Sequence, residues 1–147
     1  MKCIYLDVCA MCRPFDDQSF MRIRFETDAV IMIEESVRKG RYSLIVSPAH
    51  FLEIGAVAQQ DEGAQLVAFL KTFGKHGSWD FNKARKRAEE LYYLNFGLAD
   101  AAHVAFAEQS AQIFITCDDL LLKRCRKAKI FLPAMCPVEF CISEGLQ

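Results

Sequence analysis

The sequence predicts an α/β fold with three layers, in which helices cover both faces of a central, mostly parallel sheet of four to five strands. Two observations lead to this prediction. Short apolar runs, which are typical of strands buried on both faces, occur at 2–7, 41–46, 113–117 and 129–132. Between these runs, apolar residues recur near a helical period, and an alternation of strands with helices indicates a parallel sheet. We expect residues 1–147 to form one domain.

The composition fits a globular protein of the cytoplasm. Of the 147 residues, 52% are hydrophobic, and a chain of this length buries roughly 70% of its unfolded surface. No apolar run approaches the roughly 20 residues of a membrane span, and the chain begins directly with the first strand, so we expect neither a membrane segment nor a signal peptide. The odd number of seven cysteines, several of them in strand-like runs, indicates reduced thiols. A net charge of −1 argues against binding to nucleic acid by bulk charge and leaves room for a local basic patch.

The first half of the chain opens with the strand KCIYLD, which ends on Asp7. Ser47 and Pro48 predict a helix start, because a hydroxyl caps the free amides and proline suits the first helical position. Asp61 is expected to cap the next helix, and Gly74 to end it. The elements expected after the opening strand are a helix at 20–37, a strand at 41–46, helices at 49–60 and 61–73, and a loop at 75–78.

The second half continues the alternation. A helix is expected to begin at Trp79 and Asp80 and to break at Gly97, and Asp100 then falls in the first turn of an alanine-rich helix. The elements expected after this point are the body of that helix at 101–109, a strand at 113–117, a helix at 120–125, a strand at 129–132 and an edge strand at 139–142.

Four acidic residues occupy related positions in this predicted fold. Asp7 and Asp118 each follow a strand, and the carboxyl ends of parallel strands are where ligands bind in open α/β sheets. Glu53 lies about a turn and a half into the helix after the second strand, and Asp100 lies where helix amides favour a carboxylate. Each acid alone has an ordinary explanation, as a helix cap, a turn residue or a surface glutamate.

Together, the four acids predict a metal site. Carboxylates gathered at one edge repel one another and have raised pKa values unless a cation is present. Mg²⁺ and Mn²⁺ prefer carboxylate and water oxygens. The chemistry that follows is metal-assisted hydrolysis of a phosphodiester, in which the ion lowers the pKa of a bound water and stabilises charge on the phosphate.

The order of these motifs resembles the PIN-domain ribonucleases, the family that includes the VapC-type toxins of bacterial toxin–antitoxin pairs. The resemblance spans residues 2 to about 132, and its most specific parts are LADAAHVAFAE, with Asp100, and IFITCDD, with Thr116 and Asp118. It implies a cytoplasmic endoribonuclease that depends on Mg²⁺ or Mn²⁺, is often dimeric and is often held inactive by an antitoxin protein. Asp7, Glu53, Asp100 and Asp118 would bind the metal and carry catalysis, and Thr116 would be a polar helper near the metal or the substrate.

The sequence departs from the family after its first acid, and its substrate contacts are less defined. Family members commonly have a hydroxyl or amide residue after the first aspartate, where Val8 stands here. The basic residues that follow Asp118, Lys123 and Arg124 among them, are candidates for contacts to RNA phosphates, and Arg13 is a further candidate. The other basic run, at 83–87, is expected to be a solvated helix face balanced by neighbouring acids.

Two other functions stay open at this point. Cys9 and Cys12 form a C-x-x-C that predicts a redox pair, or a zinc site completed by Cys136 and Cys141, although packing of small residues is the favoured interpretation. The other alternative is a PIN-like domain that binds RNA or protein without cutting. His103, one turn after Asp100, is interpreted as a core histidine or as a partner of a site residue.

Overall fold

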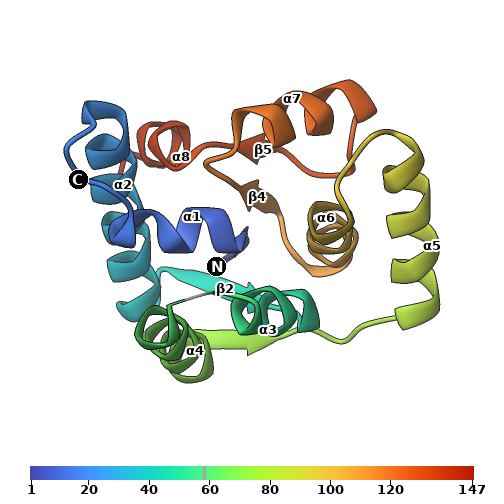
Figure 1. Ribbon diagram of the computed structural model, residues 1–147, viewed down its shortest axis with the longest axis horizontal. Coiled ribbons are helices and arrows are strands. Elements are labelled where there is room, and N and C mark those ends of the chain that lie inside the picture. The colour runs from blue at the N-terminus through green and yellow to red at the C-terminus, as the bar shows by residue number, and fades with distance from the viewer. Residues whose placement is uncertain (58) are drawn as a thin grey trace.

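The computed structural model describes residues 1–57 and 59–147. Within them, five parallel strands form one sheet in the order β3-β2-β1-β4-β5, with β1 at its centre (Figure 1). The predicted sheet of four to five mostly parallel strands is therefore confirmed. The strands are β1 (Lys2–Leu6), β2 (Tyr42–Val46), β3 (Gly74–His76), β4 (Ile113–Ile115) and β5 (Ala134–Met135).

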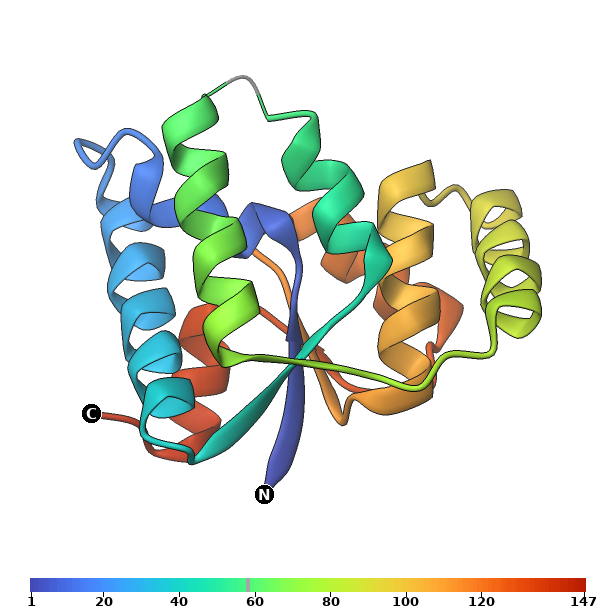
Figure 2. The same cartoon turned by 90° about the horizontal axis from the view of Figure 1, so that it is seen from below.

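Helices cover both faces of the sheet, which confirms the three layers. Figure 2 shows the strands running between α2 and α4 on one side and α5 and α6 on the other. One face is covered by α1 (Val8–Cys12), η1 (Arg13–Phe15), α2 (Met21–Arg38), α3 (Pro48–Gly55), α4 (Gln60–Phe73) and α8 (Pro137–Glu144). The opposite face is covered by α5 (Phe81–Tyr93), α6 (Leu98–Ser110) and α7 (Asp119–Ala128).

The central strand shows why the sheet needs two cores. Along β1, Ile4 and Leu6 enter the cluster under α2 and α4, whereas Tyr5 enters the cluster under α6. Successive side chains of a strand point to opposite faces, so a strand covered on both faces must be apolar throughout. This requirement explains why the strands that could be predicted are continuous apolar runs. It also makes Tyr5 notable, because its buried hydroxyl needs a partner.

Three predictions in the first half of the chain were wrong. The helix expected at 49–60 ends at Gly55, and Asp61 lies in the first turn of α4 rather than at its cap, which is Gln59. Part of the loop expected at 75–78 belongs to β3, which pairs with β2. This strand has no apolar pattern and begins at Gly74, where a Cβ atom would collide with Val46 and with the carbonyl of Leu70. Close backbone approach, rather than a hydrophobic run, defines this strand.

The two strands expected near the C-terminus were also wrong. Lys129, in the left-handed conformation with φ of 52°, ends α7, and the last strand is Ala134–Met135 instead of 129–132. Residues 139–142 lie within α8, which begins with Pro137 after Cys136, whose sulfur accepts a hydrogen bond from the Glu139 amide. A short apolar run does not distinguish a strand from a buried helix turn, whereas proline at the first position favours the helix.

The sheet brings the ends of β1 and β4 together, and this junction positions the site. Leu6 pairs with Ile115, and the amide of Asp7 donates to the carbonyl of Ile115 at 3.1 Å. The residues that follow the two strands, Asp7 and Thr116, are therefore neighbours. Among the described helices, none combines the length and apolar character needed to cross a membrane.

Candidate active site

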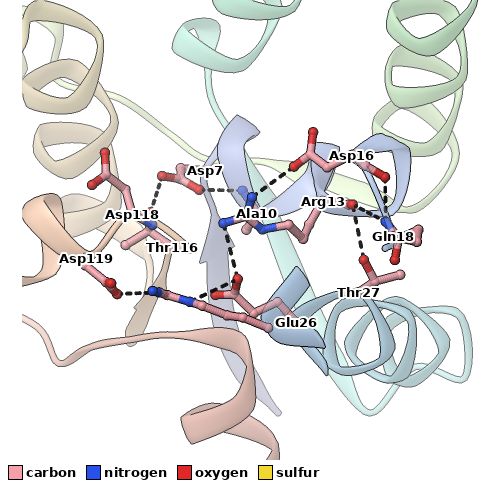
Figure 3. A network of polar contacts seen from close by, with 11 residues as sticks. Asp7, Ala10, Arg13, Asp16, Gln18, Glu26, Thr27, Thr116, Asp118 and Asp119 are labelled. Carbon is pink, nitrogen blue, oxygen red and sulfur yellow. Dashed lines mark hydrogen bonds and ion pairs between the residues drawn. The ribbon is translucent and has the colours of Figure 1, made fainter. Parts of the chain in front are cut away.

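Thr116 links the two aspartates that follow the central strands. Its hydroxyl donates to Asp7 Oδ2 at 2.5 Å and accepts a hydrogen bond from the amide of Asp118 at 3.1 Å. The other oxygen of Asp7 accepts from the amide of Ala10 at 2.9 Å, so Asp7 also caps α1 (Figure 3). Both carboxylate oxygens of Asp7 are thus held in place, and the structure brings together three residues of the predicted site.

Burial of Asp7 is electrostatically unfavourable. The side chain is 2% exposed, and burial raises its pKa from 3.8 to about 6. The hydrogen bonds from Thr116 and Ala10 oppose this rise, because they favour the charged form, while the negative charge of Asp100 adds to it. Two hydrogen bonds therefore do not fully replace the water that this carboxylate loses on folding.

Asp100 and Asp118 lie at the starts of two helices on the same edge. Asp118 Oδ1 accepts from the amides of Leu120 at 2.9 Å and Leu121 at 3.2 Å, so the expected alternative of a helix cap is correct for this residue. Asp100 is half-buried in the first turn of α6. Burial raises the pKa of Asp100, and the negative charges of Asp118 and Glu53 raise it further. The charges of Asp118 and Glu53 thus act on Asp100, and the charge of Asp100 acts on Asp7.

A hydrogen-bonded network of buried polar side chains lies next to these acids. The Tyr5 hydroxyl contacts Ser47 Oγ at 2.7 Å and His103 Nδ1 at 2.6 Å. The amide of Ser47 donates to His50 Nδ1 at 3.0 Å, so the proton of this ring lies on Nε2, which donates to the carbonyl of Leu6 at 2.7 Å. Burial lowers the pKa of His50 to about 4, which keeps the ring neutral, as this bonding pattern requires.

His103 connects this network to Glu53. If Ser47 donates to the Tyr5 oxygen and Tyr5 donates to His103 Nδ1, each hydroxyl proton has an acceptor and the ring proton of His103 lies on Nε2. That nitrogen is fully buried, makes no hydrogen bond among the described residues, and lies 3.4 Å from Glu53 Oε2. An unpaired buried donor costs about 1–3 kcal/mol, so a small movement of the Glu53 carboxylate toward His103 is favoured. His103 is thus both a core residue and a partner of a predicted site residue.

Tyr5→Phe tests the energetic importance of this network. We expect it to lower the free energy of unfolding by about 1–3 kcal/mol, because His103 Nδ1 and Ser47 Oγ lose their common partner inside the core. Tyr42→Phe is the matched control. It removes a hydroxyl that donates to Glu144 at 2.8 Å near the surface, where water replaces the lost partner. Urea denaturation measures the free energy of unfolding of both variants. An equal decrease for the two would contradict the conclusion that the buried network stabilises the fold.

The predicted substrate contacts differ in their surroundings. Arg13 is held within the fold by ion pairs to Asp16 at 3.0 Å and Glu26 at 3.2 Å (Figure 3). Lys123 and Arg124 lie on α7, the helix that Asp118 caps. The positive charge of Arg124 lowers the pKa of Asp100, which places this cation near the acidic edge.

The cysteines form no site of the kind that the C-x-x-C motif suggested. All seven thiols are free, and Cys9 and Cys12 lie in α1 with pKa values raised mainly by burial to about 12 and about 11. Raised pKa values disfavour the thiolate that redox and metal chemistry require. Within residues 1–57 and 59–147, no three His, Cys, Asp or Glu side chains form a ready-made metal centre. This finding applies to the cysteines and to the acids alike.

Comparisons with known proteins give a distant likeness in fold. No protein-family model matches the sequence, and no curated protein matches it. Among solved structures, the crystal structure of FitAcB from Neisseria gonorrhoeae contains a chain that is 14% identical, with 91% of this chain and 97% of that chain covered and a TM-score of 0.49. A likeness at this level carries no argument about function or about site residues.

Proposed function

We propose that this protein is a PIN-like endoribonuclease that hydrolyses RNA phosphodiester bonds with Mg²⁺ or Mn²⁺. The observation that carries the proposal is the uncompensated acidic edge around Asp7. Among the described residues, no lysine or arginine forms an ion pair with Asp7, Asp100 or Asp118. Repulsion and burial raise the pKa values of Asp7 and Asp100, and a bound cation would reverse this effect.

The residues fit such an ion by their chemistry. Asp7, Glu53, Asp100 and Asp118 offer the oxygen donors that Mg²⁺ and Mn²⁺ prefer. Among the described residues, they do not form a ready-made centre as they stand. Asp7 is fixed by its two hydrogen bonds, whereas Glu53 and Asp100 are half-buried.

Each part of the chain would then have a distinct task. Asp7 would hold the ion at the end of the central strand, Thr116 holds Asp7 and Asp118 together by its two hydrogen bonds, and His103 lies 3.4 Å from Glu53 and would help to position it. Asp100, on which the charges of Asp118 and Glu53 act, would supply a further oxygen ligand to the ion. A bound ion of this kind activates water and stabilises the charge that develops on the phosphate.

The partners we propose follow from the same resemblance to PIN-domain toxins. They are an RNA substrate, a second copy of the chain in a homodimer, and a cognate antitoxin protein that blocks the acidic edge. The raised thiol pKa values leave the redox or zinc module without support from the geometry. A non-cleaving PIN-like domain is separated from the proposal only by an activity measurement.

That measurement is cleavage of a 5′-labelled single-stranded RNA by the purified protein. We expect cleavage with Mg²⁺ or Mn²⁺, none with excess EDTA, and loss of cleavage in Asp100→Asn, which removes a charged ligand while keeping the size of the side chain. Circular dichroism of Asp100→Asn serves as the folding control. Metal-independent cleavage, or full activity in Asp100→Asn, would contradict the proposal.

A further inference from the structure

A hollow of about 950 Å³ lies on the surface between the α5–α6 connection and α7. One wall is the segment from Tyr92 to Gly97, and the other wall contains Arg124 and Lys127. The hollow adjoins the acidic edge, because a Cβ atom on Gly97 would lie 3.7 Å from Asp100 Oδ2 and because the Arg124 charge acts on Asp100. We call it the Tyr93 groove.

The aromatic wall of the Tyr93 groove is held by a rigid helix end. The amide of Asn95, which has φ of 73°, donates to the carbonyl of Tyr92 at 3.0 Å, and the amide of Phe96 donates to the carbonyl of Leu91 at 3.1 Å. These two bonds are the Schellman pattern that closes a helix. Phe96 is buried and anchors the turn, whereas Tyr92 and Tyr93 are 52% and 83% exposed. The turn therefore presents aromatic rings to solvent at a fixed position.

The opposite wall supplies positive charge that is not neutralised within the fold. Arg124 and Lys127 lie three residues apart on one face of α7, and neither forms an ion pair among the described residues. Arg126, on another face of the same helix, pairs with Glu139 at 3.3 Å. In the other basic run, Arg85 and Arg87 are also paired with acids, as expected for a solvated helix face. Two cations of α7 without an ion pair among the described residues, Arg124 and Lys127, thus line the groove.

We infer that the Tyr93 groove binds single-stranded RNA, with a base stacked on Tyr93 and neighbouring phosphates against Arg124 and Lys127. Exposed aromatic rings beside a basic strip are the combination that single-stranded nucleic acid requires, because unpaired bases offer free π-faces while phosphates need cations. A duplex keeps its bases stacked inside and offers only its backbone. This inference rests on the proposed function, since it names the substrate form that reaches Asp100 from the groove.

The test measures binding without cleavage. A fluorescein-labelled 12-nucleotide single-stranded RNA is titrated with the wild-type protein in EDTA, and the same RNA annealed to its complement is titrated in parallel. We expect Tyr93→Ala to weaken single-strand binding by about fivefold or more through lost stacking. We expect Arg124→Gln to weaken it and to reduce its salt dependence by about one charge, whereas Tyr93→Ala leaves the salt dependence unchanged.

Two matched variants serve as controls. Phe81→Ala removes an exposed aromatic at the other end of α5, and Arg126→Gln removes the cation of α7 that is paired with Glu139. Equal effects of Tyr93→Ala and Phe81→Ala would overturn the inference, as would duplex binding as tight as single-strand binding. A change of oligomeric mass in Tyr93→Ala with unchanged RNA affinity would identify a protein interface and also overturn it. Because no metal is present, these results are independent of whether Asp100→Asn abolishes cleavage.

Discussion

Asp7→Asn is expected to stabilise the metal-free protein while it abolishes RNA cleavage. The folded pKa of Asp7, about 6, lies above its ordinary value of 3.8, so the folded state binds a proton more readily than the unfolded state. Ionisation of Asp7 therefore opposes folding, and stability falls as pH rises from about 4 through about 6. The difference of about two pH units corresponds to roughly 3 kcal/mol at neutral pH. Asparagine keeps the shape of the side chain and removes this charge.

Urea denaturation in EDTA at pH 4 and at pH 7.5 measures this effect. At pH 4, where Asp7 is largely protonated in the folded protein, Asp7→Asn and the wild type should have nearly the same free energy of unfolding. At pH 7.5 the free energy of unfolding of Asp7→Asn should exceed that of the wild type by the largest amount. Asp119→Asn is the control, since Asp119 is exposed and its pKa is lowered, mainly by a hydrogen bond from Arg22. If Asp7→Asn raised the free energy of unfolding by the same amount at both pH values, or lowered it at pH 7.5, burial of the charged Asp7 would not be what destabilises the fold.

Asp118→Asn is expected to lower the cleavage rate by about a hundredfold or more, whereas Asp119→Asn leaves it unchanged. The two acids are adjacent, but Asp118 lies on the acidic edge and Asp119 pairs with Arg22 at 2.6 Å on the surface. Asparagine caps helices as well as aspartate does, so Asp118→Asn keeps α7 intact while it removes the charge. The expected loss reflects the removal of a charged oxygen ligand of the proposed ion, since even residues that only support metal ligands typically cost about 10–100-fold in activity when they are mutated.

Single-turnover cleavage of the same single-stranded RNA separates the two variants. Their unfolding transitions should agree with that of the wild type closely enough to exclude misfolding as the cause. If Asp119→Asn reduced the rate as strongly as Asp118→Asn, the choice of Asp118 rather than Asp119 as the site residue of IFITCDD would be wrong. If neither reduced it, the acidic edge would have no part in the reaction.

The parts of the fold that could be predicted are those encoded locally. Continuous apolar runs gave β1, β2 and β4, and the serine–proline pair gave the start of α3, because each signal lies within a few residues. β3 could not be predicted in this way, since its pairing depends on close approach of Gly74 to Val46 across the sheet. The strand predicted at 139–142 was wrong, because a short apolar run fits a strand and a buried helix turn alike. Pro137 at the start of α8 and the packing of α8 against α2 favour the helix.

The same division applies to the candidate site. The positions of Asp7, Thr116 and Asp118 could be predicted, because residues that follow neighbouring parallel strands meet at one edge. The chain of contacts from Ser47 through Tyr5 and His103 to Glu53 could not, because it joins three segments far apart in sequence, which are β1, α3 with its cap Ser47, and α6. The tyrosine in an otherwise apolar central strand was the available signal, since a buried hydroxyl requires a partner. The exposed ring of Tyr93 could not be predicted as part of a site either, because Tyr92, Tyr93, Asn95 and Gly97 together form the pattern of an ordinary helix end.

Calorimetric titration of Mn²⁺ into the metal-free protein tests most directly whether the acidic edge is a metal site. We expect saturable binding to the wild type, and binding weakened by about tenfold or more in Asp7→Asn and in Asp100→Asn, because each variant removes a charged oxygen ligand. Asp119→Asn should bind like the wild type, since its carboxylate pairs with Arg22 away from the edge. Equal Mn²⁺ affinity in the wild type, Asp7→Asn and Asp100→Asn would contradict the account.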